Sequence, residues 1–302
     1  MKWFRVTVII LALTSGLYCE QTDCRFSVPV TVTDAKTLEP LIGFGTDSFQ
    51  IRVGKQKLAP SEVSHRTIDR VFLFVDASGS MRSGPRRWAI VVQTAYELLS
   101  NITNRVPFTT EVFAERGRSF TKRDEAYSYL RYLGENITKT RPLGGRTELY
   151  DDIASAVDSE HIGIDDAVII ITDGGDNLSK TDESTLTREL ADRAIHPAFL
   201  FLTPEPNPQT LVEENARIRI PQIAEELGGF VLYLPSTQPK KPEHILPLRF
   251  YAEALAYYRV TFVTSAPRNP QLKVVPLTKP TGKFRKFEVH APDRLPSCSF
   301  EQ

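Results

Sequence analysis

The sequence predicts an α/β protein in which a doubly wound, mostly parallel sheet is inserted into a small β-sandwich. Three observations lead to this fold class. Strand and helix patterns alternate from residue 71 onward, which is typical of a parallel sheet with helices on both faces. Strand patterns also occur at both ends of the chain, in segments that are each too short to bury a core alone. Paired with each other, the two end segments would form one sandwich, with the α/β domain as an insertion within it.

The first 19 residues have the pattern of a secretory signal peptide. A basic start at residues 1–5 precedes an apolar run at residues 6–13, and small or polar residues follow. The run is too short to span a bilayer comfortably. We therefore expect residues 1–19 to be removed and the mature protein to be secreted, periplasmic or on the cell surface. A retained anchor is the alternative; a lipid on Cys19 is disfavoured, because Tyr18 stands where a bacterial lipobox has a small residue.

The cysteines lie at the two ends of the chain. Cys19, Cys24 and Cys298 are the only ones, so cleavage after Cys19 would leave an even pair in an oxidising compartment. We expect Cys24 and Cys298 to form a disulfide that ties the first strand to the last segment. Two unpaired thiols are the alternative.

Residues 20–68 form the predicted N-terminal β segment. Residues 26–33 alternate in polarity and are rich in β-branched side chains, as strands are. Further strands are predicted at residues 49–53 and 59–64, with turns at residues 34–37 and 54–57.

Polar side chains follow the next strand directly. Residues 71–75 are the apolar run of a buried strand, and Asp76, Ser78 and Ser80 follow at every second position. Open α/β sheets bind ligands at this end of a strand. Carboxylate and hydroxyl oxygens suit Mg²⁺ or Mn²⁺, with Ca²⁺ as an alternative, rather than zinc. A single carboxylate would leave such an ion under-neutralised, so the ion would bind a further anionic oxygen from outside.

This segment resembles the D-x-S-x-S motif of the von Willebrand factor type A domain, at its metal-ion-dependent adhesion site. Residues 144–151 resemble the family's second loop, whose threonine is a metal ligand, and residues 165–177 resemble its fourth strand and following loop. The resemblance implies that the hydroxyls bind the ion directly and that the aspartates often act through water. Taken singly, each residue could instead be a helix cap or a turn residue, and this is our interpretation of Asp176. The implied ligands are Asp76, Ser78, Ser80, Thr147 and Asp173.

The predicted α/β domain extends over residues 69–236. Its longest helix pattern ends at Gly228 and Gly229, which are typical helix terminators. Helices are predicted at residues 86–103, 124–136, 148–159 and 209–227, and further strands at residues 106–113, 195–202 and 230–234.

Residues 237–302 are predicted to contain a linker, a helix and a C-terminal β segment that pairs with the N-terminal one. The helix is predicted at residues 243–257, and strands at residues 258–264, 272–275 and 284–290. Integrin β-subunits resemble this arrangement of a sandwich split by an inserted domain. The ends also resemble the secreted bacterial VWFA-related family first named from acidobacteria, through residues 28–34, 258–262 and 282–289.

Composition and motifs narrow the function. The 302 residues include 37 basic and 37 acidic ones, and zero net charge gives no argument for nucleic acid or an anionic membrane surface. No segment after the N-terminal one has the apolar length of a membrane span. The five histidines are scattered away from the metal motifs, and Ser78 lacks the G-x-S-x-G pattern of a nucleophile. No general base therefore stands out for catalysis.

We therefore predict a secreted, non-catalytic binding protein rather than an enzyme. A Glu or Asp of a partner protein would complete the coordination of the ion. The basic residues Arg82, Arg86 and Arg146 would line the rim of the site and favour an acidic partner, or form ordinary solvated surface. The alternatives are a scaffold or accessory subunit of an envelope or extracellular complex, with metal-independent binding, and a metal-dependent hydrolase.

Overall fold

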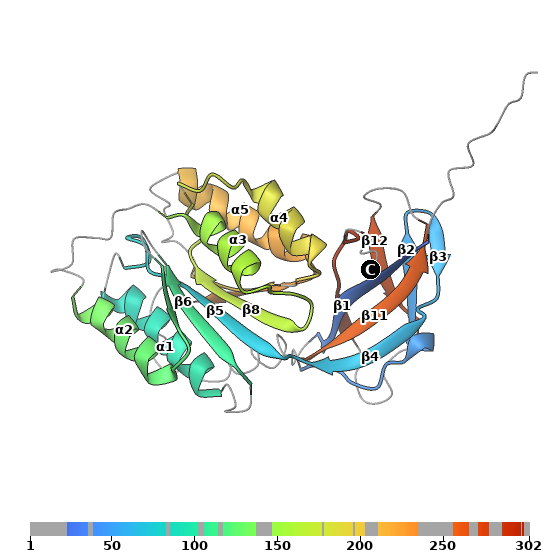
Figure 1. Cartoon of the computed structure of the whole chain (residues 1–302), viewed down its shortest axis with the longest axis horizontal. Helices are drawn as coiled ribbons and strands as arrows, with labels where there is room; N and C mark the ends of the chain where they lie inside the picture. Colours follow the sequence, from blue (N-terminus) through green and yellow to red (C-terminus); the bar gives the residue numbers. More distant parts are fainter. Residues whose placement is uncertain are drawn as a thin grey trace, which may run out of the picture.

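The computed structural model describes residues 23–35, 39–82, 85–101, 106–113, 117–136, 147–176, 178–195, 197–202, 211–234, 256–265, 271–277, 286–296 and 298. Figure 1 shows two bodies side by side, a layered α/β domain and a smaller body built of strands. The predicted signal peptide and nearly all of the helix predicted at residues 243–257 lie outside the described residues. None of the helices in the described ranges is long and apolar enough to cross a membrane.

The smaller body is a sandwich of two antiparallel sheets. The larger sheet has the order β13-β1-β11-β4 and the smaller one the order β12-β2-β3. Each sheet combines strands from both ends of the chain, which confirms the predicted pairing of the end segments. The strands are β1 (Cys24–Asp34), β2 (Phe49–Val53), β3 (Gln56–Leu58), β4 (Glu62–Thr67), β11 (Ala256–Thr264), β12 (Leu272–Pro276) and β13 (Phe287–His290), and the one-turn helix η1 (Thr46–Ser48) precedes β2.

A hydrophobic core fills the space between the two sheets. Alternate side chains of a strand point to the same face, and Phe26 and Val28 of β1 pack in this way with Ile51 of β2. Cys24 and Cys298 lie against this core and form a disulfide, with their Cα atoms 5.8 Å apart. The expected link between the first strand and the last segment is therefore confirmed.

The α/β domain contains a mixed sheet in which the described strands have the order β10-β9-β8-β5-β6-β7. All neighbours run parallel except β6 and β7, which are antiparallel. The strands are β5 (Arg70–Asp76), β6 (Phe108–Phe113), β7 (Arg118–Phe120), β8 (Asp166–Thr172), β9 (Pro197–Leu202) and β10 (Phe230–Leu234).

Helices cover both faces of this sheet (Figure 1). Val71 and Leu73 of β5 pack in one cluster with α1 and α2, whereas Phe72 and Phe74 pack in another with α3, α4 and α5. The central strand is buried on both sides, which explains its continuous apolar run. The predicted doubly wound fold is confirmed. The helices are α1 (Pro85–Asn101), α2 (Arg123–Glu135), α3 (Leu149–Ser159), α4 (Glu183–Asp192) and α5 (Leu211–Glu226).

Some elements differ from their predicted bounds. The strand predicted at residues 59–64 is instead β4, because its residues pair with β11 from Glu62 to Thr67. The helix predicted up to residue 257 is wrong at its end, where Ala256 and Tyr257 begin β11. The turn predicted at residues 54–57 is shorter, since β3 already begins at Gln56. Neither β7 nor α4 was predicted from the sequence.

Candidate metal centre

The polar residues after β5 lie at the carboxyl edge of two neighbouring strands. β5 and β8 run parallel with Val75 beside Ile171, so the residues that follow, Asp76 and Thr172, are neighbours as well. The Thr172 hydroxyl donates a hydrogen bond of 2.8 Å to Oδ2 of Asp76, although the two residues are 96 positions apart. The pairing of these two strands thus brings the first and third motifs together.

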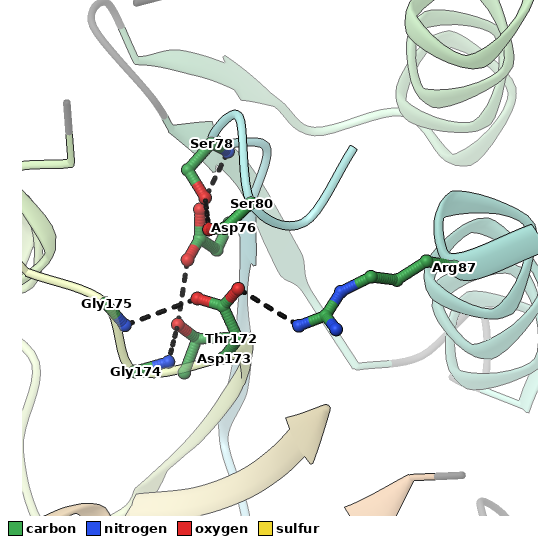
Figure 2. A network of polar contacts seen from close by, with 8 residues as sticks. All are labelled: Asp76, Ser78, Ser80, Arg87, Thr172, Asp173, Gly174 and Gly175. Atoms are coloured by element: carbon green, nitrogen blue, oxygen red, sulfur yellow. Dashed lines mark hydrogen bonds and ion pairs between the residues drawn. The ribbon is translucent and has the colours of Figure 1, made fainter. Parts of the chain in front are cut away.

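The carboxylate of Asp76 is buried and held at both oxygens. The backbone N–H of Ser78 donates to Oδ1 over 2.8 Å, while Thr172 donates to Oδ2. Thr172 in turn accepts a hydrogen bond of 2.9 Å from the N–H of Gly174. Figure 2 shows this chain of contacts running from the loop after β5 to the loop after β8. The direction of the Asp76 side chain is therefore fixed before any ligand binds.

The two serine hydroxyls lie side by side above Asp76 (Figure 2). Their Oγ atoms are 3.0 Å apart. Octahedral Mg²⁺ holds its ligands at 2.0–2.1 Å, which places adjacent ligand oxygens about 2.9 Å apart. The Ser78 and Ser80 hydroxyls are hydrogen-bonded to each other at this distance, which is also the separation of two adjacent ligands of one small cation.

Asp173 approaches the same place from β8 and is paired with an arginine. Its Oδ1 accepts a hydrogen bond of 3.2 Å from the N–H of Gly175, and its Oδ2 lies 3.1 Å from a guanidinium nitrogen of Arg87. The Arg87 side chain is 11% exposed and that of Asp173 2% exposed. Arg87 was not predicted from the sequence. Its place in the sequence could have indicated it, because the first turn of the helix that follows β5 must lie at the carboxyl edge of the sheet.

The two buried carboxylates repel each other. Burial, together with the charge of Asp173, raises the pKa of Asp76 to about 7, although hydrogen bonds from Ser78 and Thr172 oppose the shift. A divalent cation at this position would relieve both effects, so the donor set fits a hard metal ion. Within the described ranges, no three His, Cys, Asp or Glu side chains are grouped to hold a metal ion. A metal at this edge would therefore depend on hydroxyl ligands.

Thr147 lies two residues before the start of α3, beside the loop that follows β8. The backbone N–H of Leu178 donates to the carbonyl of Thr147 over 3.2 Å. The Ser179 hydroxyl accepts hydrogen bonds of 3.1 Å from the N–H groups of Tyr150 and Asp151. These contacts connect the second motif to the third. Thr147 is buried, and its role as a ligand stays a prediction.

No protein-family model and no curated protein matches this chain. Solved structures do resemble it. They include an aerotolerance-related membrane protein from Bacteroides fragilis (17% identity, 61% of this chain and 98% of that one, TM-score 0.44). They also include a von Willebrand factor type A structure from Catenulispora acidiphila (14% identity, 86% and 75%, TM-score 0.42). A third is proximal thread matrix protein 1 of the mussel byssus with a zinc-occupied MIDAS motif (16% identity, 66% and 50%, TM-score 0.44).

The sheet order, the helices on both faces and the ordered motifs at the strand ends decide the fold. In these features the inserted domain resembles the von Willebrand factor type A fold, and we call it the type A domain. The TM-scores of these solved structures are below 0.5, so their functions are not transferred to this chain.

Two further residues near these motifs are Arg82, whose position differs from that expected, and Asp176, whose position agrees. Arg82 does not line the rim, because it is 4% exposed and its Nε donates to the carbonyl of Ala77 over 2.8 Å. Burial lowers the pKa of Arg82. Asp176 accepts from the N–H groups of Leu178 and Ser179, which confirms its interpretation as a turn residue. Arg146 and the side chain of Arg86 lie outside the described part of the chain.

Proposed function

We propose that this protein is a secreted binding protein that holds an acidic group of a partner protein through a divalent cation. The cation is Mg²⁺ or Mn²⁺, with Ca²⁺ as an alternative. One observation carries the proposal: two buried carboxylates and a pair of serine hydroxyls converge at the ligand-binding edge of the sheet. The proposed ligands are Asp76, Ser78, Ser80, Thr147 and Asp173.

Charge explains why the partner would supply a carboxylate. Once a bound cation displaces the proton of Asp76, Asp76 and Asp173 carry two negative charges, and Arg87 returns one positive charge next to Asp173. A bound divalent ion would leave the site with one positive charge in a buried setting. A Glu or Asp from the partner would neutralise that charge and complete the coordination. The ion would supply a Lewis-acidic position for the partner's carboxylate. The fixed side chains of Asp76 and the two serines would hold the ion in place.

Binding fits the site better than catalysis. A hydrolase would need a positioned base beside the metal. His161 precedes β8 and so lies at the opposite edge of the sheet, whereas His65 and His290 belong to strands of the sandwich. In the described part of the domain, no histidine stands at the carboxyl edge. We therefore propose no reaction for this protein.

A scaffold role without metal is the second candidate. The observation that favours it is the ion pair between Arg87 and Asp173, because it gives that carboxylate a positive partner without any metal. In this case the binding surface would be stable and functional in the presence of a chelator.

Thermal unfolding with EDTA, Mg²⁺, Mn²⁺ and Ca²⁺ tests the proposal. An ion that binds only the folded state stabilises it by about 2.7 kcal/mol at 100 times its Kd. We expect a rise in Tm with Mg²⁺ or Mn²⁺ that is lost in Asp76→Ala. The matched control is Asp124→Ala, which removes an exposed carboxylate of α2 and should keep the rise.

The outcome separates the two candidates. A shift of equal size in Asp76→Ala would place the ion elsewhere and contradict the proposed site. No shift with any of the three ions would favour the scaffold. A pull-down of partners in Mg²⁺ and in EDTA then tests whether binding itself requires the ion.

A further inference from the structure

A cavity of about 340 Å³ lies where the sandwich meets the type A domain. Its walls include four arginines and two acidic residues, Glu62 and Asp192, together with two hydroxyl residues and a few apolar side chains. Its volume falls at the lower end of the range for small-molecule sites. The arginines are Arg25, Arg66, Arg193 and Arg259.

One wall is the outer face of the larger sheet of the sandwich. Arg66 of β4 stands opposite Tyr257 of β11, and Ser27 of β1 stands opposite Thr261. Cross-strand partners share a face of a sheet, and the residues between them, such as Val260, point into the core instead. The strand register therefore collects polar side chains on the face that turns toward the α/β domain. Figure 1 shows β4 and β11 on the side of the sandwich from which β5 begins.

The other wall comes from the amino edge of the type A sheet. Ile164 precedes β8, and Arg193 and Ala194 follow α4. A ligand here would contact both bodies at once. The site is at the opposite end of the strands from Asp76 and Asp173, so it is separate from the candidate metal centre.

The arginines are only partly neutralised by acidic neighbours. Arg66 has no ion-pair partner among the described residues, although its charge acts on Asp165. The acids of two other ion pairs, Glu62 and Asp158, have side chains that are 50% and 85% exposed. Such pairs are weak because water and salt screen them. Each guanidinium offers five N–H donors, of which an ion pair uses one or two. The pairs are Arg25 with Glu62, Arg193 with Asp158 and Arg259 with Asp165.

Two buried donors on the β4–β11 pair also have no hydrogen-bond partner among the described residues. Nε of Arg259 and Oγ of Ser64 are buried and make no hydrogen bond within the described structure. The two residues stand opposite each other in the β4–β11 pair. Buried polar atoms without partners are uncommon in native proteins and are often satisfied by a water or an ion. Of the two residues, Arg259 lines the cavity.

We propose that this cavity binds a phosphate or sulfate group of a small ligand. A guanidinium forms parallel hydrogen bonds with the oxygens of such groups. Arg66 and Arg259 approach from the sandwich and Arg193 from the type A domain, so donors reach the ligand from several directions. A tetrahedral dianion has enough oxygens to accept from all of them, whereas one carboxylate is satisfied by a single bidentate arginine. Because the ligand contacts both bodies, it fixes their relative position.

Isothermal titration of the mature protein with inorganic phosphate and with sulfate tests this proposal. EDTA is present and the ionic strength is constant, which removes any contribution of the metal centre and of general screening. We expect saturable binding at millimolar concentration or below. Arg66→Gln and Arg193→Gln, one from each wall, should each weaken it about tenfold or more, because each removes charged hydrogen bonds. Acetate should bind to the wild-type protein no more tightly than phosphate binds to these two variants.

Controls make the outcome decisive. Arg131→Gln removes an exposed arginine of α2 that pairs with Glu135, and it should bind phosphate like the wild type. Circular dichroism without anion establishes that each variant folds; Arg25→Gln replaces any variant that does not. Equal phosphate affinity in the wild type and in both wall variants would overturn the proposal. Absence of saturable phosphate and sulfate binding, or acetate binding as tight as that of phosphate, would also overturn it.

Discussion

The hydroxyl of Tyr257 donates a hydrogen bond of 2.6 Å to Oδ1 of Asp165. Tyr257 belongs to the sandwich and Asp165 to the loop before β8 of the type A domain, so this bond joins the two bodies. Tyr257 is 1% exposed and packs with the core of the α/β domain. Arg259, two residues further along β11, forms an ion pair with the same carboxylate. Asp165 is thus the acceptor on which two side chains of the sandwich converge.

Asp165 should make the stability of the protein depend on pH. Burial alone would raise the pKa of Asp165, but hydrogen bonds from Tyr257 and Arg259 and the charges of nearby arginines lower it below its usual value. A lowered folded pKa means that the stabilisation is complete above the unfolded pKa of about 3.9. It is lost as the pH falls through the folded pKa. We expect Asp165→Asn to lower the free energy of unfolding at pH 7 by about 1–2 kcal/mol.

Urea unfolding of the wild type and Asp165→Asn at pH 7 and pH 3 measures this effect. The difference between the two proteins should shrink at pH 3, because below the unfolded pKa of about 3.9 the unfolded chain takes up the proton and the carboxylate stabilises the folded state less. Tyr257→Phe is the matched control, since it removes one hydrogen bond and should cost about 1 kcal/mol at pH 7. An equal difference at both pH values would show that the carboxylate charge does not stabilise the junction.

Local sequence patterns predicted the parts of the site that depend on one strand. Asp76, Ser78 and Ser80 follow a run of buried residues, and their spacing alone placed them on the end of β5. The junction could not be predicted in this way, because Tyr257 and Asp165 are 92 positions apart and meet only when β11 pairs with β1 and β4.

Short elements and buried charges were also beyond local patterns. β7 has three residues, and its pairing with β6 defines it rather than any periodicity of its own. Arg82 was predicted to line the rim or to form ordinary solvated surface, whereas its hydrogen bond to the carbonyl of Ala77 holds it inside. By contrast, α4 carried a readable signal, because Asp182 caps it by accepting from the N–H of Thr185.

Arg87 should stabilise the protein most when no metal is bound. Its removal in Arg87→Gln leaves the buried carboxylate of Asp173 without a positive partner. We expect a loss of about 2–4 kcal/mol in EDTA, because breaking a buried pair strands the remaining charge. Under our proposed function, saturating Mg²⁺ should restore part of this loss by supplying the missing positive charge. Thermal unfolding in EDTA and in Mg²⁺ measures both values.

The control for Arg87→Gln is Arg131→Gln, whose exposed pair with Glu135 should contribute less than about 1 kcal/mol. Equal stability of Arg87→Gln and the wild type in EDTA would contradict the stabilising role of the ion pair. If Mg²⁺ raises the Tm of Arg87→Gln by no more than it raises the Tm of the wild type, the metal does not replace the positive charge of the arginine.

The hydroxyl ligands can be tested one at a time. Ser80→Ala and Thr147→Ala each remove one proposed oxygen ligand while leaving both carboxylates in place. We expect each to weaken Mg²⁺ binding about tenfold or more, whereas stability in EDTA changes by about 1 kcal/mol or less for the half-buried Ser80. Isothermal titration with Mg²⁺ measures the affinity. Unchanged affinity in Thr147→Ala would remove Thr147 from the ligand set and leave the other four residues.

The disulfide should stabilise the sandwich without affecting the metal centre. Cys24 and Cys298 close a loop with a sequence separation of 274 residues, and cross-links that close long loops contribute about 2–5 kcal/mol. The double variant Cys24→Ser with Cys298→Ser should therefore unfold at lower urea concentration. Because Asp76 and Asp173 are held by bonds within the type A domain, the variant should keep the Mg²⁺ response of the wild type. Loss of that response in a folded variant would mean that the sandwich supports the metal centre through the junction at Asp165.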